Sequence, residues 1–324
     1  MKYQDLAKFT RALHSGKIAG VILWQGASAI DGAPIVLVAT KFYAGSDNDK
    51  TGAMVQTFIL PCPKAAGIET RGATPSRIVA WLKATGAQSI CGDCPHAWQY
   101  DAESGEYAKG SCYVREYQSP AAVLGAVARG SYPIAGIDFP RDWILYLAAG
   151  LMVRLGSYGD PAACDPGVIA EFVHRAAGRT GYTHMWKSAY TGARDNALAL
   201  APYVMASCDN AADYAAAQAL GFRAFLVTPQ SPAYAQRSIL SVGAHVAGAM
   251  ICPASTEFEN VTGRLSSCAK CGACSGAQGK GAHMPNVFIP AHGATGGRIK
   301  AQDPVAASCP AALAIVARFE GVAA

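Results

Sequence analysis

Cysteine is the residue type best suited to chemistry in this chain, and the cysteines of interest fall into two sets. The first set is Cys91, Cys94 and Cys112, of which the first two form a CxxC pair in a polar turn that contains glycine. Thiolates at this spacing select zinc, copper(I) or an iron–sulfur cluster. Three protein ligands leave one position open, which suits catalysis on zinc or on one iron of a cluster. His96 is a candidate fourth ligand, and a site closed by it would be a structural zinc site instead.

The second set lies near the C-terminus and consists of Cys252, Cys268, Cys271 and Cys274. Four thiolates complete a tetrahedron, so we expect a structural zinc ion there, with an auxiliary iron–sulfur cluster as the alternative. His292, which follows the last expected strand, is a further candidate metal ligand.

Composition limits the class of protein. The chain has 324 residues, of which 51% are hydrophobic and 15% are charged, and it contains 34 glycines. These values are typical of a compact globular protein and exclude a disordered one. The net charge of +5 permits nucleic acid as a partner without demanding it.

The cysteines also bear on the compartment. Residues 1–17 show no apolar run followed by a cleavage site, so no secretory signal is expected. The longest apolar stretch, 143–153, is shorter than the roughly 20 residues that a membrane span needs. We therefore expect a cytoplasmic protein without a membrane partner, in which closely spaced cysteines bind metal rather than form disulfides.

The pattern of apolar runs predicts the elements that must position these residues. Runs at 19–24, 34–39 and 54–60 predict an antiparallel sheet at the N-terminus. From residue 74 onward helices and strands alternate, which predicts a parallel sheet. The expected helices are 74–84, 119–129, 168–177 and 210–220, and the expected later strands are 151–155, 181–186, 203–207, 222–227, 246–251 and 286–290.

The chain has neither a GxGxxG sequence nor a Walker lysine loop, which open nucleotide-binding sheets usually carry. We therefore predict an α/β protein built on a complete or partial (β/α) TIM-like barrel. In this prediction a β-rich segment, 1–73, packs on a barrel core, 74–251, that carries the first cysteine set. Residues 252–324 form a cysteine-rich lobe with the last strand.

Three polar residues lie at or just beyond the ends of expected strands, and in barrels the working residues lie at the carboxyl ends of strands. Asp160 could bind a ribose or an amino group or abstract a proton, or it could cap the following turn. His184 is a candidate for proton transfer because imidazole titrates near neutral pH, although a hydrogen-bonded core histidine fits equally well. Asp209 is a third catalytic candidate, but we favour a role as the N-cap of the next helix.

At Cys91, Cys94 and the Cys112-Tyr113-Val114 sequence the chain resembles phage-borne proteins that are divergent relatives of the radical S-adenosylmethionine enzymes. That superfamily has a partial (β/α) barrel. Three cysteines after its first barrel strand hold a [4Fe–4S] cluster, and the open iron binds S-adenosylmethionine. The spacing in this chain, CxxC followed by a distant third cysteine, differs from the CxxxCxxC of the superfamily.

The resemblance extends to other parts of the chain. The turn at 156–161 is similar to strand-end turns of such phage families, so the resemblance assigns Tyr113, Ser157 and Gly159 to cofactor binding. The second cysteine set is similar to the auxiliary-cluster regions of some members. Relatives in phages hypermodify DNA bases, which implies an isomerase-like or hypermodifying enzyme that acts on DNA or a nucleotide in the host cytoplasm.

A second resemblance is to tRNA-guanine transglycosylases and their phage relatives that modify DNA, which are also (β/α) barrels. It implies a zinc site at Cys268, Cys271, Cys274 and His292. Asp160 and Asp209 would then be the nucleophile and the general acid/base. A third hypothesis is that the chain is not an enzyme but a nucleic-acid-binding module whose fold is stabilised by zinc.

Overall fold

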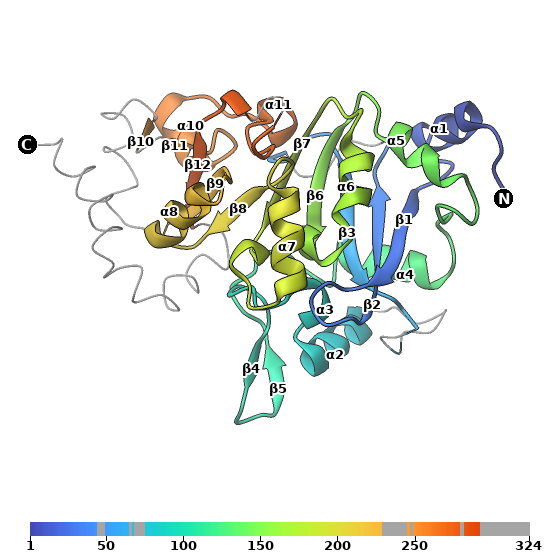
Figure 1. Ribbon diagram of the computed structural model, residues 1–324, viewed down its shortest axis with the longest axis horizontal. Helices are drawn as coiled ribbons and strands as arrows, with labels where there is room; N and C mark the ends of the chain where they lie inside the picture. The colour runs from blue at the N-terminus through green and yellow to red at the C-terminus, as the bar shows by residue number, and fades with distance from the viewer. Residues whose placement is uncertain are drawn as a thin grey trace, which may run out of the picture.

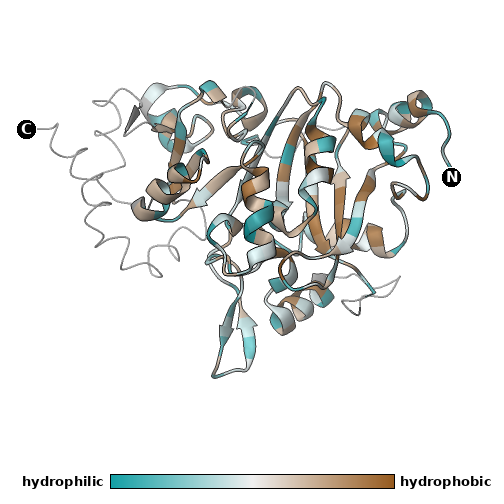
Figure 2. Ribbon diagram, in the orientation of Figure 1, coloured by the Kyte–Doolittle hydropathy of each residue, from teal (hydrophilic) through white to brown (hydrophobic). Residues whose placement is uncertain are grey.

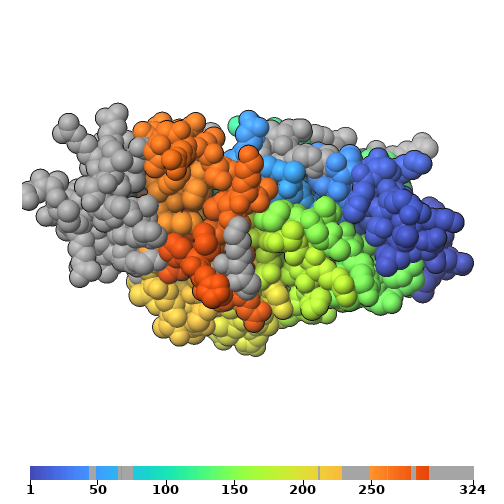
Figure 3. Space-filling view, turned by 90° about the horizontal axis from the view of Figure 1, so that it is seen from above, coloured from blue at the N-terminus to red at the C-terminus, as the bar shows by residue number. Residues whose placement is uncertain are grey.

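The computed structural model describes residues 1–43, 49–64, 67, 75–228, 245–246, 249–278 and 282–291 (Figure 1). His292, one of the predicted metal ligands, lies outside these residues, as does Thr74, the expected start of a helix. In the view from above, the N-terminal and C-terminal parts of the described chain occupy opposite regions of an elongated molecule (Figure 3).

Ten strands of the described chain form one mixed sheet, in the order β1-β2-β3-β6-β7-β8-β9-β12-β11-β10. Strands β1 to β3 are antiparallel, as predicted, and β3 to β11 are paired in parallel in that order. The strands are β1 Gly20–Ala27, β2 Pro34–Thr40, β3 Val55–Pro61, β6 Met152–Tyr158, β7 Gly178–Thr183, β8 Met205–Cys208, β9 Ala224–Thr228, β10 His245–Val246, β11 Ala249–Ile251 and β12 Asn286–Pro290.

The α/β class is confirmed, but the predicted TIM-like barrel is wrong, because the sheet is open. To close a barrel, the first parallel strand, β3, would have to pair with the last one. Strand β2 already occupies that edge of β3, and β12 inserts between β9 and β11, so the order of strands reverses at the other end. Strands from all three predicted segments share one sheet.

The helices of the described chain are mostly short. They are α1 Leu6–His14, α2 Pro75–Thr85, α3 Gln88–Cys91, α4 Ser119–Ala128, α5 Ile144–Leu147, α6 Pro166–Val173, α7 Thr191–Leu200, α8 Ala211–Ala219, α10 Thr256–Thr262 and α11 Cys268–Cys271. None of them combines the length and the apolar character that a membrane span requires. The polar helix α7 was not predicted, nor was a hairpin of β4 Gln99–Asp101 and β5 Glu106–Ala108, which projects from the body of the molecule (Figure 1).

The sheet separates two apolar layers, because successive side chains of a strand point to opposite faces. Ala206, Leu226 and Phe288 belong to the main core, together with helices such as α6 and α7. Met205 and Val287, their neighbours in sequence, belong to a second cluster under the C-terminal lobe. The central strands are accordingly rich in hydrophobic residues, whereas the β4–β5 hairpin is not (Figure 2).

The turn after β6 holds Asp160 at the carboxyl edge of the sheet. Gly159 has a φ of +77°, and a Cβ atom there would lie 2.8 Å from the carbonyl oxygen of Ile59. The backbone N–H of Asp160 donates to the carbonyl of Ile90 at 2.7 Å, which ties this turn to the first cysteine segment. Glycine at position 159 is thus required by the backbone and by its close approach to β3.

A pair of glycine substitutions tests this constraint. Gly150→Ala, at a φ of +71° with nothing within 4 Å, should cost only the strain of the left-handed backbone, about 1–2 kcal/mol of unfolding free energy. Gly159→Ala should cost about 1–3 kcal/mol more, because β3 must move to admit the methyl group. Urea denaturation of both variants measures the difference, and equal costs would contradict the close contact.

Candidate functional site

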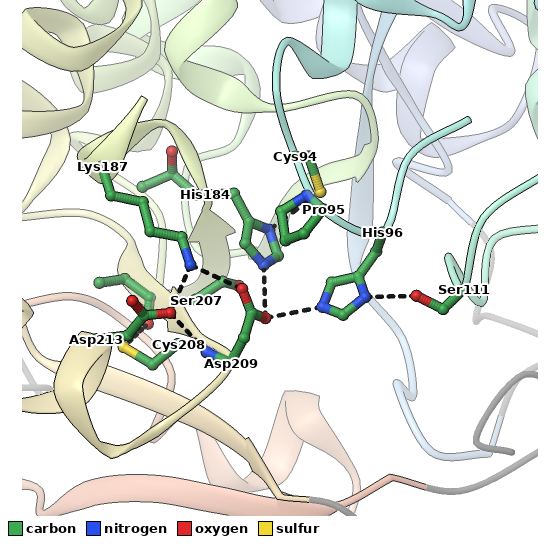
Figure 4. A network of polar contacts seen from close by, with 12 residues as sticks. Cys94, Pro95, His96, Ser111, His184, Lys187, Ser207, Cys208, Asp209 and Asp213 are labelled. Atoms are coloured by element: carbon green, nitrogen blue, oxygen red, sulfur yellow. Dashed lines mark hydrogen bonds and ion pairs between the residues drawn. The ribbon is translucent and has the colours of Figure 1, made fainter. Parts of the chain in front are cut away.

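Three strand-end residues meet at the carboxyl edge of the parallel sheet. Asp160 follows β6 after one residue, and His184 and Asp209 directly follow β7 and β8. The prediction that these residues lie at strand ends is confirmed. Figure 4 shows that two imidazoles and the amine of Lys187 point at the carboxylate of Asp209.

Asp209 brings two histidines together through one oxygen atom. Its Oδ1 lies 2.8 Å from Nε2 of His96 and 3.3 Å from Nε2 of His184. The two imidazole rings lie edge to face with centroids 5.3 Å apart. Among the described residues, only these three bring three potential metal-ligating atoms to within 4.8 Å of one another.

The other oxygen of Asp209 is held by a lysine. Lys187 Nζ donates to Oδ2 of Asp209 at 2.8 Å and also to the carboxylate of Asp213. Asp213 in turn accepts a hydrogen bond from the backbone N–H of Asp209 at 3.1 Å. The carboxylate of Asp209 is therefore fixed in both position and orientation.

The expected N-cap role of Asp209 is wrong. Asn210 is the N-cap of α8, and its side chain accepts from the backbone N–H of Asp213 at 2.8 Å. Both residue types make good caps, and the helix begins one residue later than expected. This shift leaves the carboxylate of Asp209 free to face the histidines.

Each histidine is anchored through its second ring nitrogen. His96 Nδ1 lies 2.6 Å from the hydroxyl oxygen of Ser111, and His184 Nδ1 lies 3.5 Å from the sulfur of Cys94. Contacts of this kind set the tautomer and the orientation of an imidazole.

The charges in the cluster shift two pKa values strongly. Burial raises the pKa of Asp209, but hydrogen bonds from His184 and His96 outweigh burial and hold it well below its ordinary value. Burial lowers the pKa of His184, whereas the neighbouring Cys94 and Asp209 raise it well above the usual range. In this structure the carboxylate is therefore ionised and attracts positive charge.

Asp160 lies next to His184, and both oxygens of its carboxylate accept hydrogen bonds. Its Oδ1 accepts from the hydroxyl of Thr183 at 2.7 Å and from the N–H of Ala162 at 3.0 Å, and its Oδ2 accepts from the N–H of His184 at 2.8 Å. Burial raises its pKa, while these hydrogen bonds act in the opposite direction. The arrangement supports a role in positioning His184, and direct participation of Asp160 in chemistry stays a prediction.

The first cysteine set gathers beside this cluster. The N–H of Cys94 donates to the carbonyl of Cys91 at 3.1 Å, and the N–H of Cys112 donates to the carbonyl of His96 at 2.8 Å. Burial, followed by the neighbouring Cys94 and Cys112, raises the pKa of Cys91 well above its ordinary value. Burial likewise raises the pKa of Cys112 to about 11. The structure thus brings the three predicted ligands into one neighbourhood.

The spacing of the sulfurs bears on which metal fits. Sulfurs that bind one zinc ion lie about 3.8 Å apart, given a zinc–sulfur bond of about 2.3 Å and a tetrahedral angle. Neither cysteine set holds three sulfurs within 4.8 Å of one another. In a cluster each cysteine binds a separate iron, so the sulfurs form a wider triangle. Both cysteine sets remain candidates for zinc or for an iron–sulfur cluster.

A buried hydroxyl also points to a bound group at the first set. Tyr158 is 5% exposed, and its hydroxyl has no hydrogen-bond partner among the described residues. Burial, and then the nearby Cys91, Glu116 and Cys112, raise the pKa of Tyr158. An orphaned buried donor costs about 1–3 kcal/mol. A cluster held by these cysteines would supply acceptor atoms for it.

The residues that the resemblance assigns to cofactor binding are dispersed. Tyr113 is 65% exposed, and its hydroxyl accepts from Arg154 at 2.8 Å. Ser157 donates to the side chain of Gln56 at 2.6 Å, and Gly159 packs against β3. Their role in binding a cofactor stays a prediction.

The second cysteine set shares one apolar cluster on the face of the sheet beneath the C-terminal lobe. Cys252 and Cys274 are buried there, and Cys268 and Cys271 pack against them from α11. The N–H of Cys268 donates to the carbonyl of Lys50 at 2.8 Å, which ties the lobe to the N-terminal part of the chain. These four residues remain candidates for zinc or an auxiliary cluster.

Sequence reasoning gave too little weight to His96 and missed three residues of the cluster. Lys187 lies three residues after His184, and Asp213 lies four residues after Asp209, so each falls one helical turn beyond a recognised candidate. A charged residue three or four positions after a candidate site residue is therefore a signal that can be found in the sequence. Ser111 has no such signal, because its contact with His96 depends on the folding of the hairpin between them.

No family model, curated protein or solved structure matches this chain.

Substitution of two tyrosines tests whether the hydroxyl of Tyr158 lacks a protein partner. In protein stripped of metal, Tyr158→Phe should raise the free energy of unfolding by about 1–3 kcal/mol, because a buried unsatisfied donor is removed. Tyr214→Phe should lower it, because Asn286 donates to that hydroxyl at 2.9 Å. Chemical denaturation measures both changes, and a loss of stability in Tyr158→Phe would contradict the orphaned hydroxyl.

Proposed function

We propose that the protein is an iron–sulfur enzyme that modifies a nucleotide base, in DNA or as a free nucleotide, with S-adenosylmethionine as co-substrate. One observation carries the proposal: Cys91 has Cys94 and Cys112 as neighbours, and the orphaned hydroxyl of Tyr158 has Cys91 and Cys112 as neighbours, beside the Asp209 cluster. Three thiolates leave one iron of a cluster open for a co-substrate, which the proposal requires.

When bound, the cluster would supply the electron that cleaves S-adenosylmethionine into methionine and a carbon radical, which takes a hydrogen atom from the substrate. The residues of this chain have separate tasks. The three thiolates would hold the cluster, and the hydroxyl of Tyr158 would donate to it. His184, anchored by Cys94 and Asp209, is placed to hold a proton at the edge of the site while its Nε2 binds no ion.

A base as substrate has support in exposed aromatic side chains close to Cys112 in sequence. Tyr113 and Tyr117 are 65% and 48% exposed and follow Cys112 within five residues. Nucleobases stack on exposed aromatic rings, at about 1–3 kcal/mol per base. The choice of a base as substrate otherwise depends on the resemblance to phage enzymes.

Purification without oxygen, followed by iron, sulfide and zinc analysis, tests the cluster. We expect a brown protein with about four irons bound by the first set. Cys91→Ala should lose that iron and its absorption. Cys164→Ala is the matched control, because Cys164 is a buried thiol outside both sets, and it should keep the iron.

The same preparation tests the chemistry. Reduced protein supplied with S-adenosylmethionine should release methionine and 5′-deoxyadenosine, and Cys91→Ala should release neither. A colourless protein that holds only zinc would overturn the proposal. That result would favour a zinc-containing, base-exchanging transglycosylase or a nucleic-acid-binding module stapled by zinc.

A further inference from the structure

We infer that His96, His184 and Asp209 form a binding site for one divalent first-row transition-metal ion, separate from both cysteine sets. The three residues come from three parts of the chain: the segment after the CxxC pair, the end of β7 and the end of β8. Their ligand atoms converge without any contribution from a sulfur.

The distances fit an ion bound at the centre of the three atoms. Ligands about 2.1 Å from one ion lie about 3.0–3.4 Å apart in octahedral or tetrahedral geometry. Oδ1 of Asp209 lies 3.3 Å from Nε2 of His184 and 2.8 Å from Nε2 of His96. The ligand atoms of the two histidines lie within 4.8 Å of each other, so a small movement of the rings would bring all three atoms around one ion.

The contacts around the three residues are those of an outer shell that supports a metal site. When an Nε2 atom binds metal, the Nδ1–H of the same ring needs an acceptor. The hydroxyl of Ser111 takes that place for His96, at 2.6 Å, and the sulfur of Cys94 takes it for His184, at 3.5 Å. A cysteine sulfur that binds iron can still accept this hydrogen bond, so the two sites are compatible.

The charges of the cluster are compatible with a bound cation. Asp209 and Asp213 carry two negative charges, and Lys187 supplies one positive charge to both. Cys94 and Asp209 favour a proton on His184, and an ion bound at Nε2 of His184 would take the place of that proton. The side chain of Asp209 is 13% exposed, so water screens its charge poorly. Of the two carboxylate oxygens of Asp209, Lys187 contacts only Oδ2, which leaves Oδ1 to the two histidines.

The donor set defines the class of ion. Two imidazoles and one carboxylate suit Mn²⁺, Fe²⁺, Co²⁺ or Zn²⁺, whereas Ca²⁺ and Mg²⁺ prefer oxygen alone. Three protein ligands leave positions open for water or substrate. The side chains of His96 and His184 are 18% and 17% exposed, so the open positions can be reached from solvent.

Mn²⁺ is the probe of choice, because thiolates bind it weakly and the cysteine sets will not compete for it. Full-length protein without an affinity tag is titrated with MnCl₂, and free Mn²⁺ is followed by electron paramagnetic resonance. We expect one saturable Mn²⁺ per chain. Asp209→Asn and His96→Ala should abolish the binding, and Ser111→Ala should weaken it about 10- to 100-fold.

His174→Ala, at the exposed C-cap of α6, and Asp195→Asn, at an exposed position of α7, are matched controls and should bind Mn²⁺ as the unmodified chain does. Circular dichroism checks that each variant is folded. If Asp209→Asn does not fold, the test depends on His96→Ala instead. Absence of saturable binding, or binding that survives both ligand substitutions, would overturn the inference. Iron and sulfide analysis tests the first cysteine set independently, so either site can fail without the other.

Discussion

The carboxylate of Asp209 is the point at which the candidate site is held together. A largely buried carboxylate is costly unless it is paired, and this one is paired with His96, His184 and Lys187. His96 comes from the segment after the CxxC pair, and His184 and Lys187 both follow β7, so satisfying one charge fixes these two segments against the end of β8. Asp160 adds a second anchor, because it holds the backbone of His184 from below.

The open sheet is sufficient for this arrangement. Parallel strands place their carboxyl ends at one edge, and the site uses only the neighbours β6, β7 and β8. Closure into a barrel would add no residue to the cluster. The first cysteine segment crosses this edge, whereas the second cysteine set covers one face of the sheet, where alternate residues of β8, β9 and β12 form its apolar floor.

The strands and the residues at their ends could be predicted, because they depend on local sequence. Apolar runs followed by a polar residue located β6, β7 and β8 and the strand-end positions of Asp160, His184 and Asp209. Barrel closure could not be judged in this way, because it depends on the pairing of β2 with β3 and of β12 with β9 and β11. The role of Asp209 was also missed, since its main partner, His96, lies 113 residues away in sequence.

Anomalous diffraction from crystals soaked in MnCl₂ tests the central claim most directly, namely that Asp209 gathers two imidazoles around a cation. The account predicts a peak at the manganese edge among Nε2 of His96, Nε2 of His184 and Oδ1 of Asp209. A peak at another place, or an unchanged hydrogen-bonded cluster in crystals that hold manganese elsewhere, would contradict it.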